Sequence, residues 1–323
     1  MIKEKTVFII GAGASCPYGF PSSAKLREEI CLAFKAEYLE YVKANWQNPP
    51  DRDAKRWLIN NFIDKFFNAT ESIDLFLAGN PTLAEIGKYI IAYKILTAEI
   101  NSHFREQSQI RNQDWYSHVF KKMREGIVYK KDLNKFSENN ISFITFNYDR
   151  SLEQFFYESL RDSFAEVPEQ EIIQILNQLK IIHVYGSIAP LEWQNIKNGV
   201  KYKTPISERI LQGTSQNLRT IYEEKQNPQL AEAKKLIAEA NKIFFLGFGY
   251  AEENMDILGL PQIISLGAKI YGTGLGLEQK EREKIHSRVW AGLKPEPEIK
   301  MKKGLYEIII EDMDCLKLLR NYL

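Results

Sequence analysis

The chain has 323 residues, of which 44% are apolar, enough to bury the core of one large domain or of two ordinary ones. Its 43 lysines and arginines balance 42 aspartates and glutamates, so bulk charge gives no support for a nucleic acid as a partner. The sequence shows neither a signal-peptide pattern nor an apolar stretch near the roughly 18 residues that a membrane span needs. These features predict a cytoplasmic protein that does not bind membranes.

The cysteines and histidines give no sign of a metal site. Cys16, Cys31 and Cys315 are widely scattered, which argues against a disulfide framework and against the paired cysteines of a structural zinc site. The histidines show no ligand spacing with carboxylates: they are His103, His118, His183 and His286. The sequence therefore predicts no bound zinc and no other metal.

The stretch from Lys5 to Pro21, KTVFIIGAGASCPYGFP, joins an apolar run to a glycine turn. Residues 6–10 predict a strand that is covered on both faces. Gly11 and Gly13 then allow a sharp turn, and amides freed there would form an anion site for a diphosphate. The alternative is an ordinary strand-to-helix turn, because a lone GxG is a short motif that often occurs by chance. The third glycine and the later acidic residue of the dehydrogenase motif are both missing.

Residues 22–140 predict a helical module inserted after the first strand. Ser22 or Ser23 can cap a helix whose apolar residues recur from Leu26 to Tyr41 at steps of three and four. The segment Asn48 to Asp51 breaks this helix, and the pattern resumes over 57–67. A short helix and turn follow in 71–81, and a long helix is expected over 83–104.

The rest of the chain alternates strands with helices. We expect strands over 141–146, 180–185, 242–246, 268–271 and 305–310, and helices from residue 151, over 231–240 and over 312–322. Residues 190–227 are expected to form loop and short helix. This alternation predicts an α/β fold with a mostly parallel sheet, in which 1–21 and 141–323 form one discontinuous domain around the inserted module.

Two polar residues follow the second predicted strand, in the segment TFNYD. Side chains at the carboxyl end of such a strand point into the ligand crevice of an open α/β sheet. Asn147 and Asp149 can therefore offer hydrogen-bonding groups to a ligand in that crevice. The alternative is that both residues cap the following helix.

Four segments resemble, in the same order, those of the sirtuin (SIR2) family. GAGAS followed by Gly19-Phe20-Pro21 resembles its opening motif, TFNYD its TQNID-like segment, KIIHVYGS its LHGS segment, and FLGFGYAEEN its later GTSL-like turn. The resemblance implies a Rossmann-like fold of the SIR2-like (DHS) type and NAD+ as ligand. The residues that it implies around NAD+ are Gly11, Ala12, Gly13, Ser15, Phe20, Pro21, Asp149, Tyr185, Gly186, Ser187, Gly247, Gly249, Asn254 and Thr273.

The resemblance also implies two catalytic residues, Asn147 and a histidine. In the LHGS segment the histidine is the general base, but here Tyr185 holds its position and His183 lies two residues upstream. Alternate residues of a strand share a face, so His183 is expected to face the same crevice as Asn147. The alternatives are that Tyr185 serves this position, or that His183 is a core residue.

Two departures from the sirtuin pattern argue against an acyl-peptide substrate. The GIPDFR continuation becomes Phe20-Pro21-Ser22-Ser23-Ala24, and the four-cysteine zinc module is missing. What remains resembles the prokaryotic SIR2-like NAD hydrolases of anti-phage defence, which have an enlarged helical module and an IDxFL-like segment.

This resemblance implies hydrolysis of NAD+ to nicotinamide and ADP-ribose, with NAD+ as substrate and no true cofactor. It also implies a homo-oligomer, controlled by assembly, by a partner ATPase or by a phage component. Two alternatives stay open. One is a module that senses NAD+ or ADP-ribose for a partner subunit, favoured by Tyr185; the other is a sirtuin-type protein deacylase.

Overall fold

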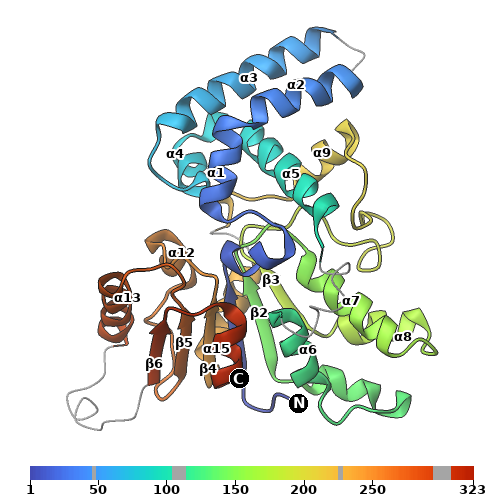
Figure 1. Ribbon diagram of the computed structural model, residues 1–323, viewed down its shortest axis with the longest axis vertical. Coiled ribbons are helices and arrows are strands. Elements are labelled where there is room, and N and C mark those ends of the chain that lie inside the picture. The colour runs from blue at the N-terminus through green and yellow to red at the C-terminus, as the bar shows by residue number, and fades with distance from the viewer. Residues whose placement is uncertain (46–48, 104–113, 225–227, 294–306) are drawn as a thin grey trace.

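Six short strands form one sheet in the computed structural model, which describes residues 1–45, 49–103, 114–224, 228–293 and 307–323 (Figure 1). Every neighbouring pair is parallel, and the order across the sheet is β3-β2-β1-β4-β5-β6. The strands are β1 (Thr6–Ile10), β2 (Ile141–Thr145), β3 (Lys180–His183), β4 (Lys242–Leu246), β5 (Lys269–Thr273) and β6 (Glu307–Glu311). The predicted α/β fold with a parallel sheet is confirmed.

This strand order has a switch point between β1 and β4. The chain moves outward from β1 to β2 and β3 on one side, and from β4 to β5 and β6 on the other. Open sheets of this kind bind their ligands beyond the carboxyl ends of the strands at the switch point. The glycine turns after β1 and β4 meet there.

One face of the sheet carries a row of aromatic rings. They lie side by side in register on four neighbouring strands: Phe143, Phe8, Phe244 and Tyr271. Three helices cover this row, namely α6 (Trp115–Arg124), α7 (Ser151–Ser163) and α15 (Cys315–Tyr322). Each contributes a ring, since Trp115 packs on Phe8, Phe156 on Phe143 and Tyr322 on Tyr271. Burial of the sheet explains the continuous apolar runs of its inner strands.

Five helices lie together beyond the carboxyl ends of the strands, at the top of Figure 1. They are α1 (Ser23–Leu32), α2 (Phe34–Asn45), α3 (Pro49–Asn68), α4 (Ile73–Gly79) and α5 (Ala84–Asn101). The Oγ atom of Ser22 accepts a hydrogen bond from the amide of Lys25 at 3.2 Å and so caps α1. Ser72 caps α4 in the same way.

Other helical segments of the predicted 22–140 module lie beside the sheet. These are α6 and the 3-10 segment η4 (Lys130–Glu138), which packs on α8 (Glu169–Leu176). Shorter 3-10 turns are η1 (Ala12–Ala14), η2 (Cys16–Tyr18) and η3 (Pro81–Leu83). The domain boundaries at 21/22 and 140/141 stay predictions.

The second half of the chain supplies five further helices. They are α9 (Glu208–Ser215), α10 (Ile221–Glu224), α11 (Pro228–Ala238), α12 (Glu252–Leu258) and α13 (Gln279–Gly292). Strand β3 ends two residues earlier than predicted, because the chain turns at Gly186, whose φ is +74°. Predictions for residues 48, 104, 225–227 and 305–306 lie outside the described residues. Within the described parts, no helix has the length and apolarity to span a membrane.

Candidate functional site

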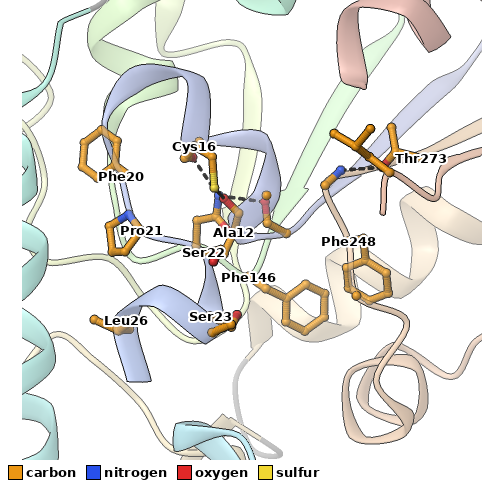
Figure 2. A pocket seen from close by; sticks show the side chains of 18 of the residues that line it. Ala12, Cys16, Phe20, Pro21, Ser22, Ser23, Leu26, Phe146, Phe248 and Thr273 are labelled. Carbon is orange, nitrogen blue, oxygen red and sulfur yellow. Dashed lines mark hydrogen bonds between the residues drawn. The ribbon is translucent and has the colours of Figure 1, made fainter. Parts of the chain in front are cut away.

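A cavity of about 960 Å³ lies at the switch point of the sheet. This volume is in the range of small-molecule sites. In Figure 2, Phe20, Pro21 and Leu26 come from the segment after β1, while Phe146 and Phe248 come from the ends of β2 and β4. The cavity is lined by most of the residues that the sequence predicts around NAD+: Gly11, Ala12, Gly13, Ser15, Phe20, Pro21, Asn147, Asp149, Gly247, Gly249, Asn254 and Thr273.

Glycines form the floor of this cavity, because two turns touch there backbone to backbone. The amide of Gly13 donates to the carbonyl oxygen of Gly247 at 3.0 Å. A Cβ atom on Gly11 would lie 2.6 Å from that oxygen, and Gly247 itself has a φ of +56°. Only glycine permits this approach.

The same contacts engage three amides of the turn that the sequence predicts to be free for a diphosphate. The amide of Gly11 donates to Leu246 at 3.0 Å, and the amide of Ala14 donates to Gly11 at the same distance. With the amide of Gly13 also engaged, these three donors stabilise the turn itself. Close packing of the turns, and not anion binding by these amides, explains the glycines.

Asn147 lines the cavity and carries a buried acceptor without a partner. Its Nδ2 donates to the Oγ of Ser15 at 2.9 Å and to the carbonyl oxygen of Gly11 at 3.2 Å. These bonds fix the orientation of the amide. The buried Oδ1 has no hydrogen-bond partner among the described residues. A buried acceptor of this kind is costly unless a ligand or a water completes it.

Asp149 lines the cavity and also caps α7. Its Oδ1 accepts a hydrogen bond from the amide of Ser151 at 3.1 Å and another from the hydroxyl of that residue. Burial raises the pKa of Asp149, and hydrogen bonds from Ser151 and Ser15 oppose this effect only in part. The capping and binding interpretations of this residue are therefore compatible.

His183 lines a different cavity, of about 520 Å³, together with Gly186 and Ser187. The expectation that it faces the same crevice as Asn147 is therefore corrected. Its Nδ1 donates to the backbone oxygen of Asn147 at 2.9 Å, and its Nε2 lies 2.7 Å from Oε1 of Glu153. Strand pairing places His183 opposite Thr145, so its ring lies behind the turn that carries Asn147.

The surroundings of His183 favour the imidazolium form. Burial alone would lower its pKa, but the charge and the hydrogen bond of Glu153 outweigh burial and raise it. In this form both ring nitrogens donate hydrogen bonds. Such a ring holds the backbone of Asn147 in place and has no lone pair free to accept a proton.

Tyr185 is buried and lines neither cavity, but it forms a hydrogen bond to a residue that lines the large one. Its hydroxyl donates to Oδ1 of Asn254 at 2.7 Å, and Asn254 lines the large cavity. The next residue, Gly186, has no room for a side chain, because a Cβ atom would lie 2.1 Å from the oxygen of Asn217. The LHGS-like segment thus supports the large cavity from outside.

Several residues of the cavity were not predicted as site residues. Phe146 and Phe248 are neighbouring rings, with centroids 5.4 Å apart, and each follows closely on the end of a strand. Asp74, on α4, accepts a hydrogen bond from the hydroxyl of Tyr148. The IDLFL segment could have identified Asp74. No sequence feature points to Cys315, which reaches the cavity from the far end of the chain.

A buried ion pair joins α5 to the end of the TFNYD turn. Arg150 and Glu99 form two hydrogen bonds, at 2.8 and 2.9 Å, and both side chains are almost fully buried. The guanidinium also donates to the carbonyl oxygens of Pro190, Val200 and Lys201. This cluster fixes the end of the TFNYD turn relative to α5 and to the segment 190–201.

Comparison with known families supports the assignment of the central segment. Residues 141–260 match the family model of the SIR2-like domain. A search of curated proteins found no match.

The SIR2-like segment spans β2 to α12, and so contains Asn147, Asp149, His183 and the turn after β4. It indicates NAD-related chemistry and NAD+ as the ligand. The turn after β1 lies outside the matched range but touches Gly247 within it. Among the described residues, no group of three or more His, Cys, Asp or Glu side chains is placed to hold a metal ion.

Proposed function

We propose that this protein hydrolyses NAD+ at the bond between nicotinamide and ribose, giving nicotinamide and ADP-ribose. The observation that carries the proposal is the buried Oδ1 of Asn147, oriented by two hydrogen bonds of its own amide nitrogen and left without a partner beside the cavity. A buried acceptor without a partner, on a residue that lines the cavity, is a group that a ribose hydroxyl or a water would complete.

Cleavage would pass through an oxocarbenium-like state, as in other glycoside hydrolyses. Asn147 would orient the ribose or the water, and Asp149 would hold the carboxamide of the leaving nicotinamide. His183 was predicted as the base from the family motif. Its bonds to Asn147 and Glu153 support the role of a positioning residue, which acts through the backbone of Asn147.

We further propose that the activity belongs to a cytoplasmic effector of anti-phage defence that depletes NAD+. This proposal rests on the resemblance of the motifs to those of such hydrolases and on the SIR2-like match. Unregulated loss of NAD+ would kill the host. Control would therefore come from homo-oligomerisation, a partner ATPase or a phage component.

A second candidate function is a module that binds NAD+ or ADP-ribose without cleavage and controls a partner. Two observations favour it. Tyr185 stands at the base position of the family motif with its hydroxyl engaged by Asn254, and His183 lies outside the large cavity.

The test is to incubate the purified full chain with NAD+ and follow nicotinamide release, with calorimetry for binding. We expect Asn147→Ala to lose at least about 100-fold in turnover in protein that remains folded, with some loss in melting temperature from its two buried hydrogen bonds, and the exposed Asn198→Ala to match the parent protein. Binding without release would support the sensing module instead. Release that depends on an acetylated peptide would indicate a deacylase.

Binding is tested separately at Gly249. A side chain there meets no atom within 4 Å and would extend into the cavity, whereas one on Gly13 would press on the backbone of Gly247. Gly249→Val should abolish NAD+ binding while leaving the fold intact. Gly213→Val, at a glycine with equally open surroundings away from both cavities, is the matched control. Unchanged NAD+ affinity in Gly249→Val would remove this cavity as the site.

A further inference from the structure

We propose that Asp74 is the proton acceptor for the water that attacks the ribose in the hydrolysis proposed above. The inference rests on that proposed function. It assigns a catalytic residue to the inserted helices, whereas every catalytic residue expected from the sequence belongs to the sheet region. Asp74 lies in the first turn of α4 and lines the large cavity.

The position of Asp74 is fixed from the TFNYD turn. The hydroxyl of Tyr148 donates to its Oδ1. Tyr148 stands in the chain between Asn147 and Asp149, and all three line the same cavity as Asp74. The carboxylate is thus tied to the turn that carries Asn147 and Asp149, the residues proposed to hold the ribose and the nicotinamide.

Of the other carboxylates around the cavity, Glu71 accepts from the amide of Thr70 at 2.9 Å and Glu253 from the hydroxyl of Ser72 at 3.2 Å, and the remaining three have structural duties. Asp114 accepts from Tyr18 and from Ser117 through its two oxygens. Asp314 caps α15 by accepting from the amide of Lys317 at 2.7 Å. Asp149 caps α7, as described above. Asp74 combines a place in the cavity with a single side-chain bond from Tyr148, which holds it without neutralising it.

The charges around Asp74 suit it to proton transfer. Burial raises its pKa to about 6, with Glu253 of α12 adding to the rise and the hydrogen bond from Tyr148 opposing it. A base with a pKa just below neutral is largely ionised at pH 7 yet strong enough to accept a proton.

Cations near α4 are engaged elsewhere. Lys88 of α5 and Glu223 of α10 pair with each other at 2.7 Å. Arg27 of α1 donates to the backbone oxygens of Phe66, Ala69 and Glu71. The titration of Asp74 is therefore governed by its burial, by Tyr148 and by Glu253.

The proposed step balances without a further reactant. Water loses a proton to a carboxylate oxygen of Asp74 while its oxygen forms a bond to C1′ of the ribose. The bond between C1′ and the nicotinamide nitrogen breaks, and its electron pair stays on nicotinamide. Asp74 then returns its proton to solvent, so that NAD+ and water give nicotinamide, ADP-ribose and H+.

The first test is Asp74→Asn in the full chain. We expect nicotinamide release to fall about 10²–10⁴-fold, the range of general acid–base catalysis, while NAD+ affinity by calorimetry changes less than the turnover does. Asp64→Asn, at an exposed aspartate of α3, is the matched control and should behave as the parent. An Asp74→Asn protein with full turnover would overturn the inference and leave the proposed hydrolysis standing. A parent protein that binds NAD+ without cleaving it would overturn both.

The second test is the acid limb of the pH dependence of turnover. Tyr148→Phe removes a bond that favours the carboxylate, so the limb should move to higher pH. Glu253→Gln removes a repelling charge, so the limb should move to lower pH. Opposite shifts would support Asp74 as the titrating base. A limb that neither variant moves would assign the proton to another group.

Discussion

The amide nitrogen of Asn147 donates to Ser15 and Gly11, and its buried oxygen has no partner among the described residues. The segment TFNYD was enough to locate this residue, because a strand of a parallel sheet must deliver its next polar residues to the ligand crevice. The sequence alone could not show the orientation of the amide, which depends on an oxygen 136 residues away in the chain.

The orientation of His183 could not be predicted from the strand pattern alone. Alternation along a strand predicts which residues share a face, but β3 ends at His183, so the rule does not extend to Tyr185. The resulting arrangement ties His183 to Glu153, 30 residues away. No local pattern encodes such a pair.

The pair of His183 and Glu153 predicts a pH dependence of stability. Because the folded-state pKa of His183 is raised above its ordinary value of 6.5, its contribution is fully present below pH 6.5 and is lost as pH rises through the higher folded-state value. We expect the melting temperature to fall over this window. The fall should be smaller in His183→Gln, as measured by calorimetry at several pH values.

An exposed histidine on α13 supplies the control for this measurement. His286→Gln should keep the pH dependence of the parent protein. If His183→Gln also keeps it, the imidazolium assignment is wrong.

The sequence predicts some helices and strands more clearly than others. The strands β1, β2 and β4 are short apolar runs bounded by polar or glycine residues, and they were found to within one residue. Helix α13 was missed because Val289 is its only buried residue, which leaves no apolar stripe to recognise. Helix α12 has only seven residues, too few to show a period.

The buried ion pair between Glu99 of α5 and Arg150, which directly precedes α7, predicts a large loss of stability on mutation. Arg150→Met leaves the carboxylate of Glu99 buried without its partner, and breaking a buried pair in this way costs about 3–5 kcal/mol. Chemical denaturation should show this loss in the free energy of unfolding. Arg161→Met, at a partly exposed arginine of α7, should change it by less than about 1 kcal/mol. Equal losses in the two variants would mean that the buried ion pair contributes no more to the free energy of unfolding than a partly exposed arginine does.

The net charge of the whole molecule is close to zero, but its charged side chains are unevenly distributed. Acidic side chains line the large cavity in excess: they are Glu71, Asp74, Asp114, Asp149, Glu253 and Asp314. Arg27 and His103 are the basic residues in the lining, and Arg27 is engaged by backbone oxygens. This distribution suits the cationic nicotinamide ring and opposes additional phosphate charge.

The acidic lining predicts a preference for NAD+ over NADP+, given the proposed hydrolysis. The extra phosphate of NADP+ would meet this negative field, and a cost of about 1.4 kcal/mol already means a tenfold loss. Release of nicotinamide from the two dinucleotides, compared at equal concentration and at low and high salt, measures the effect. Equal rates at low salt would contradict the prediction.

The cavity spans the boundary between the proposed sheet domain and the proposed 22–140 module. Its wall combines residues after β1, β2 and β4 with residues of α1 and α4, so neither part alone would enclose a ligand. Composition and periodicity could separate a helical stretch from a strand-containing one. They could not show that α6 returns to cover the sheet, because this depends on the fit of Trp115 against Phe8.

The four residues from Asn147 to Arg150 bond to five different parts of the protein. Asn147 holds the turn after β1, Tyr148 reaches α4, Asp149 caps α7, and Arg150 is locked to α5 and to the segment 190–201. A displacement of α4 and α5 would therefore pull on the peptide units on both sides of Asp149. A partner that bound to α4 or α5 could in this way change the shape of the cavity around Asn147 and Asp149. No residue of the partner would need to enter the cavity.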